Sequence, residues 1–143
     1  MGTLITADDL AIELPKGGEV ALFKWFLASF LMGKRIQATV SAETYRVIVE
    51  KHGIDSPKKL VRLSHRQLVS MLGEGGYARY DESTATRLSA LGKKLIDDYS
   101  GKIGTIRQRS ENRQAFEKRL QEFDGVGPKT VEIFMREAAQ VLF

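Results

Sequence analysis

Apolar residues recur every three or four positions along almost the whole of this 143-residue chain. This spacing places them on one face of an α-helix. No segment alternates apolar and polar residues as a half-buried β-strand would, and glycine, proline and serine separate the helical segments. We therefore expect an all-α fold, a bundle of about seven or eight helices, in which residues 1–143 form a single domain.

The most apolar helix is expected over 19–32, where it should lie at the centre of the core with Trp25 buried in it. The same periodicity predicts further helices over 41–51, 57–63, 64–72, 81–99, 111–122 and from 128 onward. Residues 73–76 read Gly-Glu-Gly-Gly, and we expect them to form a flexible loop.

The residues at several of these helix starts are of the types that cap helices. Ser56 precedes a proline, which is favoured at the first helical position. Ser64, with Gln67 three residues later, matches the pattern of a capping box. Asp81 and Ser110 are expected to cap the helices that follow them.

The composition excludes several classes of site. The sequence has no cysteine, which rules out disulfides, thiolate zinc sites and cysteine-bound iron–sulfur clusters. Its two histidines are too few for a conventional metal site without carboxylates, so we expect no metal. The net charge of +4 fits a nucleic-acid partner, although many other proteins share such a bias. No apolar run reaches the ~18 residues of a membrane span and no basic segment marks a secretory signal, so we expect an intracellular protein without membrane contact.

The most informative segment is 120–131, which reads Leu-Gln-Glu-Phe-Asp-Gly-Val-Gly-Pro-Lys-Thr-Val. Gly125 and Gly127 should adopt backbone conformations that a Cβ disfavours and should leave main-chain N–H groups uncovered, while Val126 points into the core. Pro128 suits the first turn of a helix, whose free N–H groups and positive dipole end favour a phosphate oxygen. Lys129 adds a positive charge. Because none of these groups reads base edges, we expect sequence-independent contact with nucleic-acid backbone; an ordinary helical hairpin with a glycine cap is the alternative.

The string Gly125-Val126-Gly127-Pro128-Lys129-Thr130 resembles the hairpin of the helix-hairpin-helix DNA glycosylase superfamily, in its endonuclease III-like branch, which reads similarly to Leu-Pro-Gly-Val-Gly-Arg-Lys-Thr-Ala. Weaker matches precede it in the right order: the apolar 26–31, the Gln-Ala-Thr of 37–39, and Gly76-Tyr77 followed by a helix that ends at 99–101. The resemblance covers about residue 19 to the C-terminus and puts the helix-hairpin-helix at about 111–142.

The resemblance implies a base-excision-repair protein, a glycosylase or AP lyase, that acts on double-stranded DNA with a damaged or abasic site. Lys129 would be the catalytic nucleophile, which forms a Schiff base with the sugar C1′ once the base is flipped out. Such a lysine must be partly deprotonated, and burial and nearby positive charge would lower its pKa. The location would be cytoplasmic or nucleoid-associated. The expected DNA contacts are Gly125, Val126, Gly127, Lys129, Thr130, Lys34, Arg35, Gln37, Tyr77 and Arg79.

Three departures from the family leave alternatives open. The family's catalytic aspartate falls beyond Phe143, the cysteine cluster that holds an iron–sulfur centre in many members is absent, and Asp124 stands where the family often has proline. The chain ends on an apolar segment, 141–143, so we expect a shortened protein or one completed by a homodimer partner or second subunit. The alternatives to an enzyme are a non-catalytic DNA-binding module and a partner-docking domain. No cofactor is expected, with a monovalent cation at the hairpin left open.

Overall fold

The computed structural model describes residues 4–143, and over this range the chain contains eight α-helices and no strand. The all-α expectation is therefore confirmed. A short 3-10 turn (Asp8–Leu10) precedes the first helix and a π-helical turn (Val47–Lys51) extends the second. The α-helices are α1 (Leu14–Met32), α2 (Ala38–Arg46), α3 (Pro57–Val61), α4 (His65–Glu74), α5 (Asp81–Tyr99), α6 (Ile103–Gln108), α7 (Arg113–Leu120) and α8 (Pro128–Leu142).

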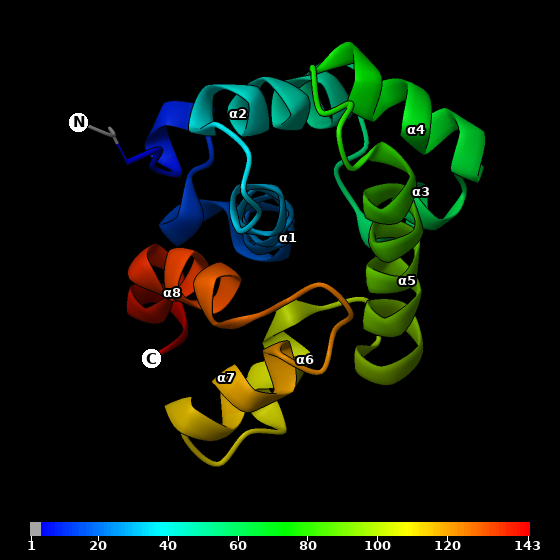
Figure 1. The fold of residues 1–143 in the computed structure, drawn as a ribbon. Helices are drawn as coiled ribbons and strands as arrows, with labels where there is room; N and C mark the ends of the chain where they lie inside the picture. The colour runs from blue at the N-terminus through cyan, green and yellow to red at the C-terminus, as the bar shows by residue number, and fades with distance from the viewer. Residues whose placement is uncertain (1–3) are drawn as a thin grey trace.

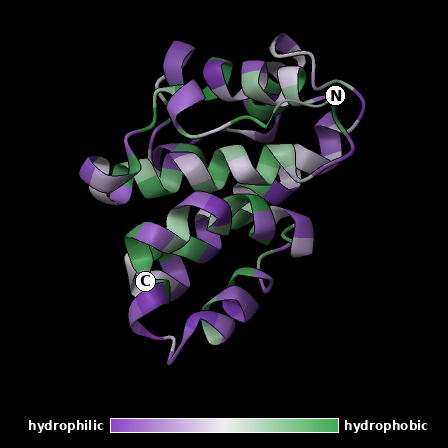
Figure 2. Ribbon diagram, turned by 90° about the vertical axis from the view of Figure 1, so that its left-hand side faces the viewer, coloured by the Kyte–Doolittle hydropathy of each residue, from purple (hydrophilic) through white to green (hydrophobic). Residues whose placement is uncertain are grey.

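Helix α1 lies at the centre of the bundle, as the apolar pattern predicts. Figure 1 shows α1 nearly end-on between α2 and α8, both of which pack against it, while α5 packs against α3 and α4 along one side. Hydrophobic residues gather along the central helix and the inward sides of its neighbours (Figure 2). Trp25 is fully buried, and its indole Nε1 donates to the carbonyl of Phe134 on α8 at 3.1 Å. The packing of α8 against α1 thus fixes the position of the last helix.

The start of α1 is interrupted at Gly18, whose φ of 60° and ψ of −144° are not helical. The regular helix therefore runs from Glu19, which agrees with the expected 19–32. The Glu19 carboxylate accepts hydrogen bonds from the amides of Ile103 and Gly104, at 2.8 and 2.7 Å. These amides open α6, a helix that the sequence pattern did not predict. A side chain distant in the sequence supplies the cap that α6 itself lacks.

The capping predictions are confirmed at two helices and wrong at two. Ser56 accepts from the amide of Lys59, and Ser64 forms a complete capping box with Gln67. Asp81 is not the cap of α5, because Tyr80 holds that position without a side-chain bond.

At α7, Ser110 is likewise not the cap. Asn112 occupies that position and accepts from the amide of Ala115 at 2.9 Å. Ser110 is buried instead, and its hydroxyl donates to the carbonyl of Ile106 at 2.7 Å.

The prediction of a flexible loop over 73–76 is wrong for the first half of the segment, because α4 continues through Gly73 and Glu74. Gly75 is buried against α2, where an added Cβ would overlap Thr44. The glycines therefore permit close packing and a turn of the chain. A run of glycines in a sequence does not show by itself whether they serve packing or flexibility.

The C-terminal segment packs against α6 and α7. The ring of Phe143 meets that of Phe116 edge to face at 5.6 Å, and the Arg107 guanidinium lies 4.1 Å from the centre of the Phe143 ring. Arg107 also donates to the carbonyl of Leu142 at 2.9 Å. Val141 and Phe143 remain 38% and 45% exposed, so a partner at this edge stays a prediction. No helix within 4–143 is long and apolar enough to cross a membrane.

Candidate nucleic-acid interface

The segment 121–127, which connects α7 to α8 and which we call the hairpin turn after its sequence, is anchored by two buried side chains. Phe123 and Val126 are 1% and 5% exposed, and the amide of Val126 donates to the carbonyl of Phe123 at 3.0 Å. The Phe123 ring meets that of Phe26 edge to face at 5.5 Å and stacks on Tyr99 at 6.1 Å. The expectation that Val126 points inward is confirmed. Burial of these side chains ties the turn to the core.

The two glycines of the turn serve different purposes. Gly125 has a φ of +84°, and an added Cβ would lie 2.9 Å from Cδ of Arg87 and 3.0 Å from Cε2 of Phe30. Gly127 has a φ of −110° and ψ of −171°, which any residue adopts, and an added Cβ would meet no atom within 4 Å. The expectation that both glycines need unusual backbone angles is therefore wrong for Gly127, whose missing side chain only leaves the surface open.

The beginning of α8 presents amides without an acceptor. The first bond of the helix runs from the amide of Val131 to the carbonyl of Gly127 at 3.1 Å. Within residues 4–143 the amides of Gly127, Lys129 and Thr130 have no hydrogen-bond acceptor, and Pro128 has no N–H. These three donors lie at the positive end of the dipole of a 15-residue helix. They are suited to a phosphate or carboxylate oxygen.

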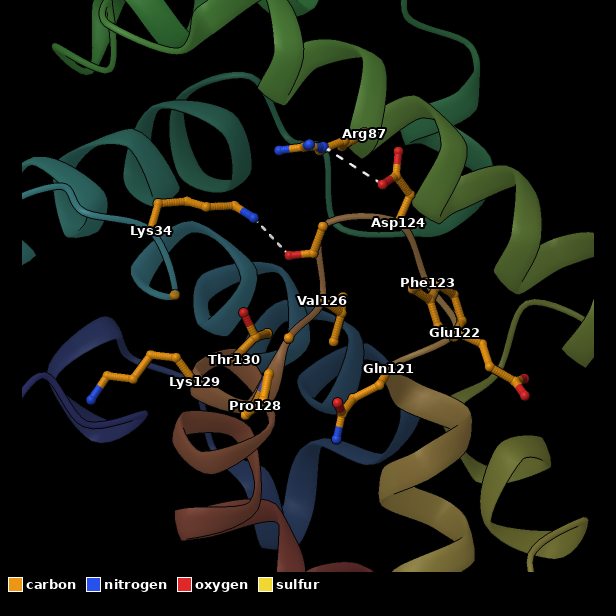
Figure 3. Close-up of a pocket in the computed structure, with 13 residues that line it drawn as sticks. Lys34, Arg87, Gln121, Glu122, Phe123, Asp124, Val126, Pro128, Lys129 and Thr130 are labelled. Atoms are coloured by element: carbon orange, nitrogen blue, oxygen red, sulfur yellow. Dashed lines mark hydrogen bonds and ion pairs between the residues drawn. The ribbon is translucent and has the colours of Figure 1, made fainter.

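These amides line an open hollow of about 680 Å³ that the hairpin turn shares with two other elements. Gly33 and Lys34 come from the connection between α1 and α2, and Arg87 comes from α5 (Figure 3). The charged residues in the lining are the cations Lys34, Arg87 and Lys129 and the anions Glu122 and Asp124. The excess of positive charge favours an anionic ligand.

Lys34 is held inside this arrangement. Its ammonium donates to the carbonyl of Gly125 at 2.6 Å (Figure 3). The same ammonium lies 4.8 Å from the centre of the Phe30 ring. Burial lowers the pKa of Lys34, the positive charge of Arg87 lowers it further, and Asp124 acts in the opposite direction. The sequence predicted Lys34 as a DNA contact; the structure places it against the hairpin backbone.

Asp124 faces Arg87 across the hollow. The Arg87 Nε lies 3.7 Å from Oδ1 of Asp124, and the carboxylate is 66% exposed (Figure 3). The negative charge that stands where the resembled family has proline is therefore partly compensated by a cation on another helix. Arg87 was not among the predicted site residues, because nothing in the local pattern of α5 separates it from other surface arginines.

Lys129 is much more accessible than Lys34. Its side chain is 64% exposed, and its Nζ lies 3.8 Å from Oε2 of Glu132. In Figure 3 it extends away from the contact between Lys34 and the hairpin backbone. Lys34 has the burial and the neighbouring cation that the resemblance implies for a nucleophilic lysine, whereas Lys129 is largely exposed.

Besides Val126, two of the residues predicted to contact DNA have buried side chains, which do not reach a ligand on the surface. Tyr77 is 0% exposed, and its hydroxyl donates to the carbonyl of Leu31 at 3.1 Å. Thr130 is 1% exposed, and its side chain is packed inside the protein. Burying the aromatic ring of Tyr77 is favourable, and the sequence pattern, an aromatic residue after a glycine-rich segment, did not reveal that the ring is buried.

The predicted contacts that lie outside the hairpin turn and α8, namely Arg35, Gln37 and Arg79, are exposed. Arg35 lines a second hollow, of about 300 Å³, which shares Gly33, Lys34 and Arg87 with the first. Arg79 is exposed, with its guanidinium 5.4 Å from the centre of the Tyr80 ring. Gln37 is exposed at the start of α2 and lines neither hollow. The structure thus brings Arg35 to the site, and Gln37 lies outside both hollows.

The described part of the chain contains no cluster of three or more histidine, cysteine, aspartate or glutamate side chains that could hold a metal ion. A monovalent cation at the hairpin stays a prediction. Comparisons of the chain with protein-family models, with curated proteins and with solved structures found no match.

Proposed function

We propose that this chain binds double-stranded DNA through the backbone, without regard to base sequence, by means of the hairpin turn and the start of α8. The observation that carries the proposal is the set of three amides, of Gly127, Lys129 and Thr130, that open α8 without an acceptor, in a hollow whose lining carries three cations and two anions. Duplex DNA presents phosphate oxygens in a regular row, and helix N-termini are a recurrent phosphate-binding element.

In this proposal the amides position one phosphate and the side chains supply longer-range attraction. A phosphate oxygen accepts from the free amides at the positive end of the α8 dipole. Lys129, being 64% exposed, reaches phosphates from solvent and adds to the salt-dependent part of the affinity. Such contacts give register on the duplex and no base preference, which suits a protein that scans DNA for damaged or abasic sites in base-excision repair.

The decisive test is Gly127→Val. The backbone angles at Gly127 suit any residue, and a Cβ there meets no atom within 4 Å, so the variant should fold normally. Its side chain would cover the approach to the amides. We expect about a tenfold weaker affinity for duplexes of every sequence, measured by fluorescence anisotropy at constant salt. Unchanged affinity, or a change in sequence preference at constant average affinity, would contradict the proposal.

A second candidate function is AP-lyase chemistry at Lys129, which is favoured by the position of this lysine in the lining of the same hollow. A neutral Lys129 amine would attack the C1′ aldehyde of an abasic site, and loss of the oxygen as water would leave an imine. Borohydride reduces an imine to a stable amine. A covalent protein–DNA adduct that is lost in Lys129→Ala would support the enzyme, and DNA binding without any adduct would leave a non-catalytic module.

A further inference from the structure

One peptide unit of the hairpin turn is held at both ends, and this feature is independent of the free amides. The unit joins Gly125 to Val126. Its N–H, on Val126, donates to the carbonyl of Phe123 at 3.0 Å, and its carbonyl, on Gly125, accepts from the ammonium of Lys34 at 2.6 Å. Both bonds restrict rotation of the peptide plane, which lies one residue before Gly127 and the first free amide.

The two partners of this peptide unit differ in kind. The bond to Phe123 is local and closes the turn, whereas Lys34 reaches across from a segment 91 residues earlier. Its ammonium lies 4.8 Å from the centre of the Phe30 ring, which is also so close to Gly125 that an added Cβ would be 3.0 Å from the ring edge. A hydrogen bond from a charged donor in a partly buried position is stronger than one between neutral groups.

We propose that Lys34 is a positioning residue, whose ammonium holds the carbonyl of Gly125 and so presets the hairpin turn for phosphate binding by the amides of Gly127, Lys129 and Thr130. In this role Lys34 touches the hairpin backbone and not the DNA. The link from Lys34 to DNA affinity rests on the proposed function, whereas the hold on the turn is a property of the free protein.

The experiment compares Lys34→Met with Lys129→Met, two variants that each remove one positive charge from the same hollow. Duplex affinity is measured between about 50 and 200 mM NaCl. A lysine that contacts phosphate contributes about one to the slope of log affinity against log salt, so Lys129→Met should lower the slope. Lys34→Met should lose about tenfold in affinity at every salt concentration with the slope unchanged. Lys34→Arg, which keeps a charged donor, should recover part of the loss.

A second measurement needs no DNA. Amide hydrogen exchange at Val126 reports on the peptide unit that Lys34 holds, and Lys34→Met should accelerate it while Lys129→Met leaves it as in the wild type. A drop of about one in the salt slope of Lys34→Met, with Val126 exchange unchanged, would show direct phosphate contact and overturn the positioning role. Equal binding by wild type and Lys34→Met would overturn it too. Failure of the wild type to bind any duplex would instead overturn the proposed function.

Discussion

Two lysines flank the hairpin turn, and the protein holds them in opposite ways. Lys34 is partly buried, bonded to a backbone carbonyl and placed over an aromatic ring. Lys129 is 64% exposed, and its nearest anion is 3.8 Å away on its own helix. A cation with fixed, partly buried partners determines local geometry, whereas an exposed cation mainly supplies screened attraction at longer range. The same charge thus serves two purposes, and the sequence pattern assigned both lysines to DNA.

The two glycines of the turn differ in the same way, because one is enclosed by neighbouring side chains and the other is open. Gly125 is enclosed by Phe30 and Arg87, and we call these residues, with Lys34, the packed side of the turn. Gly127 has open space around it and leads to Lys129, and we call this pair the open side. The packed side should govern stability and the shape of the turn, and the open side should govern contact with a ligand.

The largest effect that this comparison predicts is on stability, at Gly125. Gly125→Ala places a Cβ at a φ of +84° and within 3.0 Å of the Phe30 ring, so both the backbone and the packing are strained. We expect the free energy of unfolding to fall by about 2–4 kcal/mol, measured by urea denaturation.

Gly127→Ala is the matched control, because it adds the same methyl group to the open side. Its cost should stay within about 0.5 kcal/mol. If the two variants were equally stable, the division into a packed and an open side would be wrong.

A smaller effect is expected from pH at Lys34. Burial and the charge of Arg87 lower the pKa of this lysine in the folded protein, Asp124 opposes them, and in the unfolded chain the pKa is about 10.4. As the pH rises between the two values, the folded protein loses the Lys34 proton while the unfolded chain keeps it. Wild type should therefore gain stability relative to Lys34→Met in this window, and it should lose DNA affinity there as the ammonium disappears.

This prediction is checked by urea unfolding and duplex titration of both proteins at about pH 8.5 and about pH 10. Lys34→Met carries every other titrating group and serves as the baseline. Stability curves that run parallel across this range would mean that Lys34 titrates alike in the folded and unfolded states.

Much of the fold could be predicted because its signals are local. The apolar spacing of 19–32 predicted the central helix, and the pairing of Ser64 with Gln67 predicted the start of α4. α6 was missed because Glu19, far away in the sequence, caps its first amides. Tyr77 was predicted as a DNA contact, because a single sequence does not show that its hydroxyl can donate to a buried carbonyl, that of Leu31.

The sequence by itself determined the helical class and the presence of a glycine-containing turn before Pro128, because periodicity and backbone preferences act over a few residues. Only the tertiary structure decided that Lys34 and Arg87 meet this turn, and that Gly125 needs the absence of a side chain while Gly127 does not. These outcomes depend on three parts of the chain that pack at one place: the end of α1 with the connection that follows it, α5, and the hairpin turn. Contacts between residues far apart in the chain follow from how whole helices bury their apolar faces, which no local pattern records.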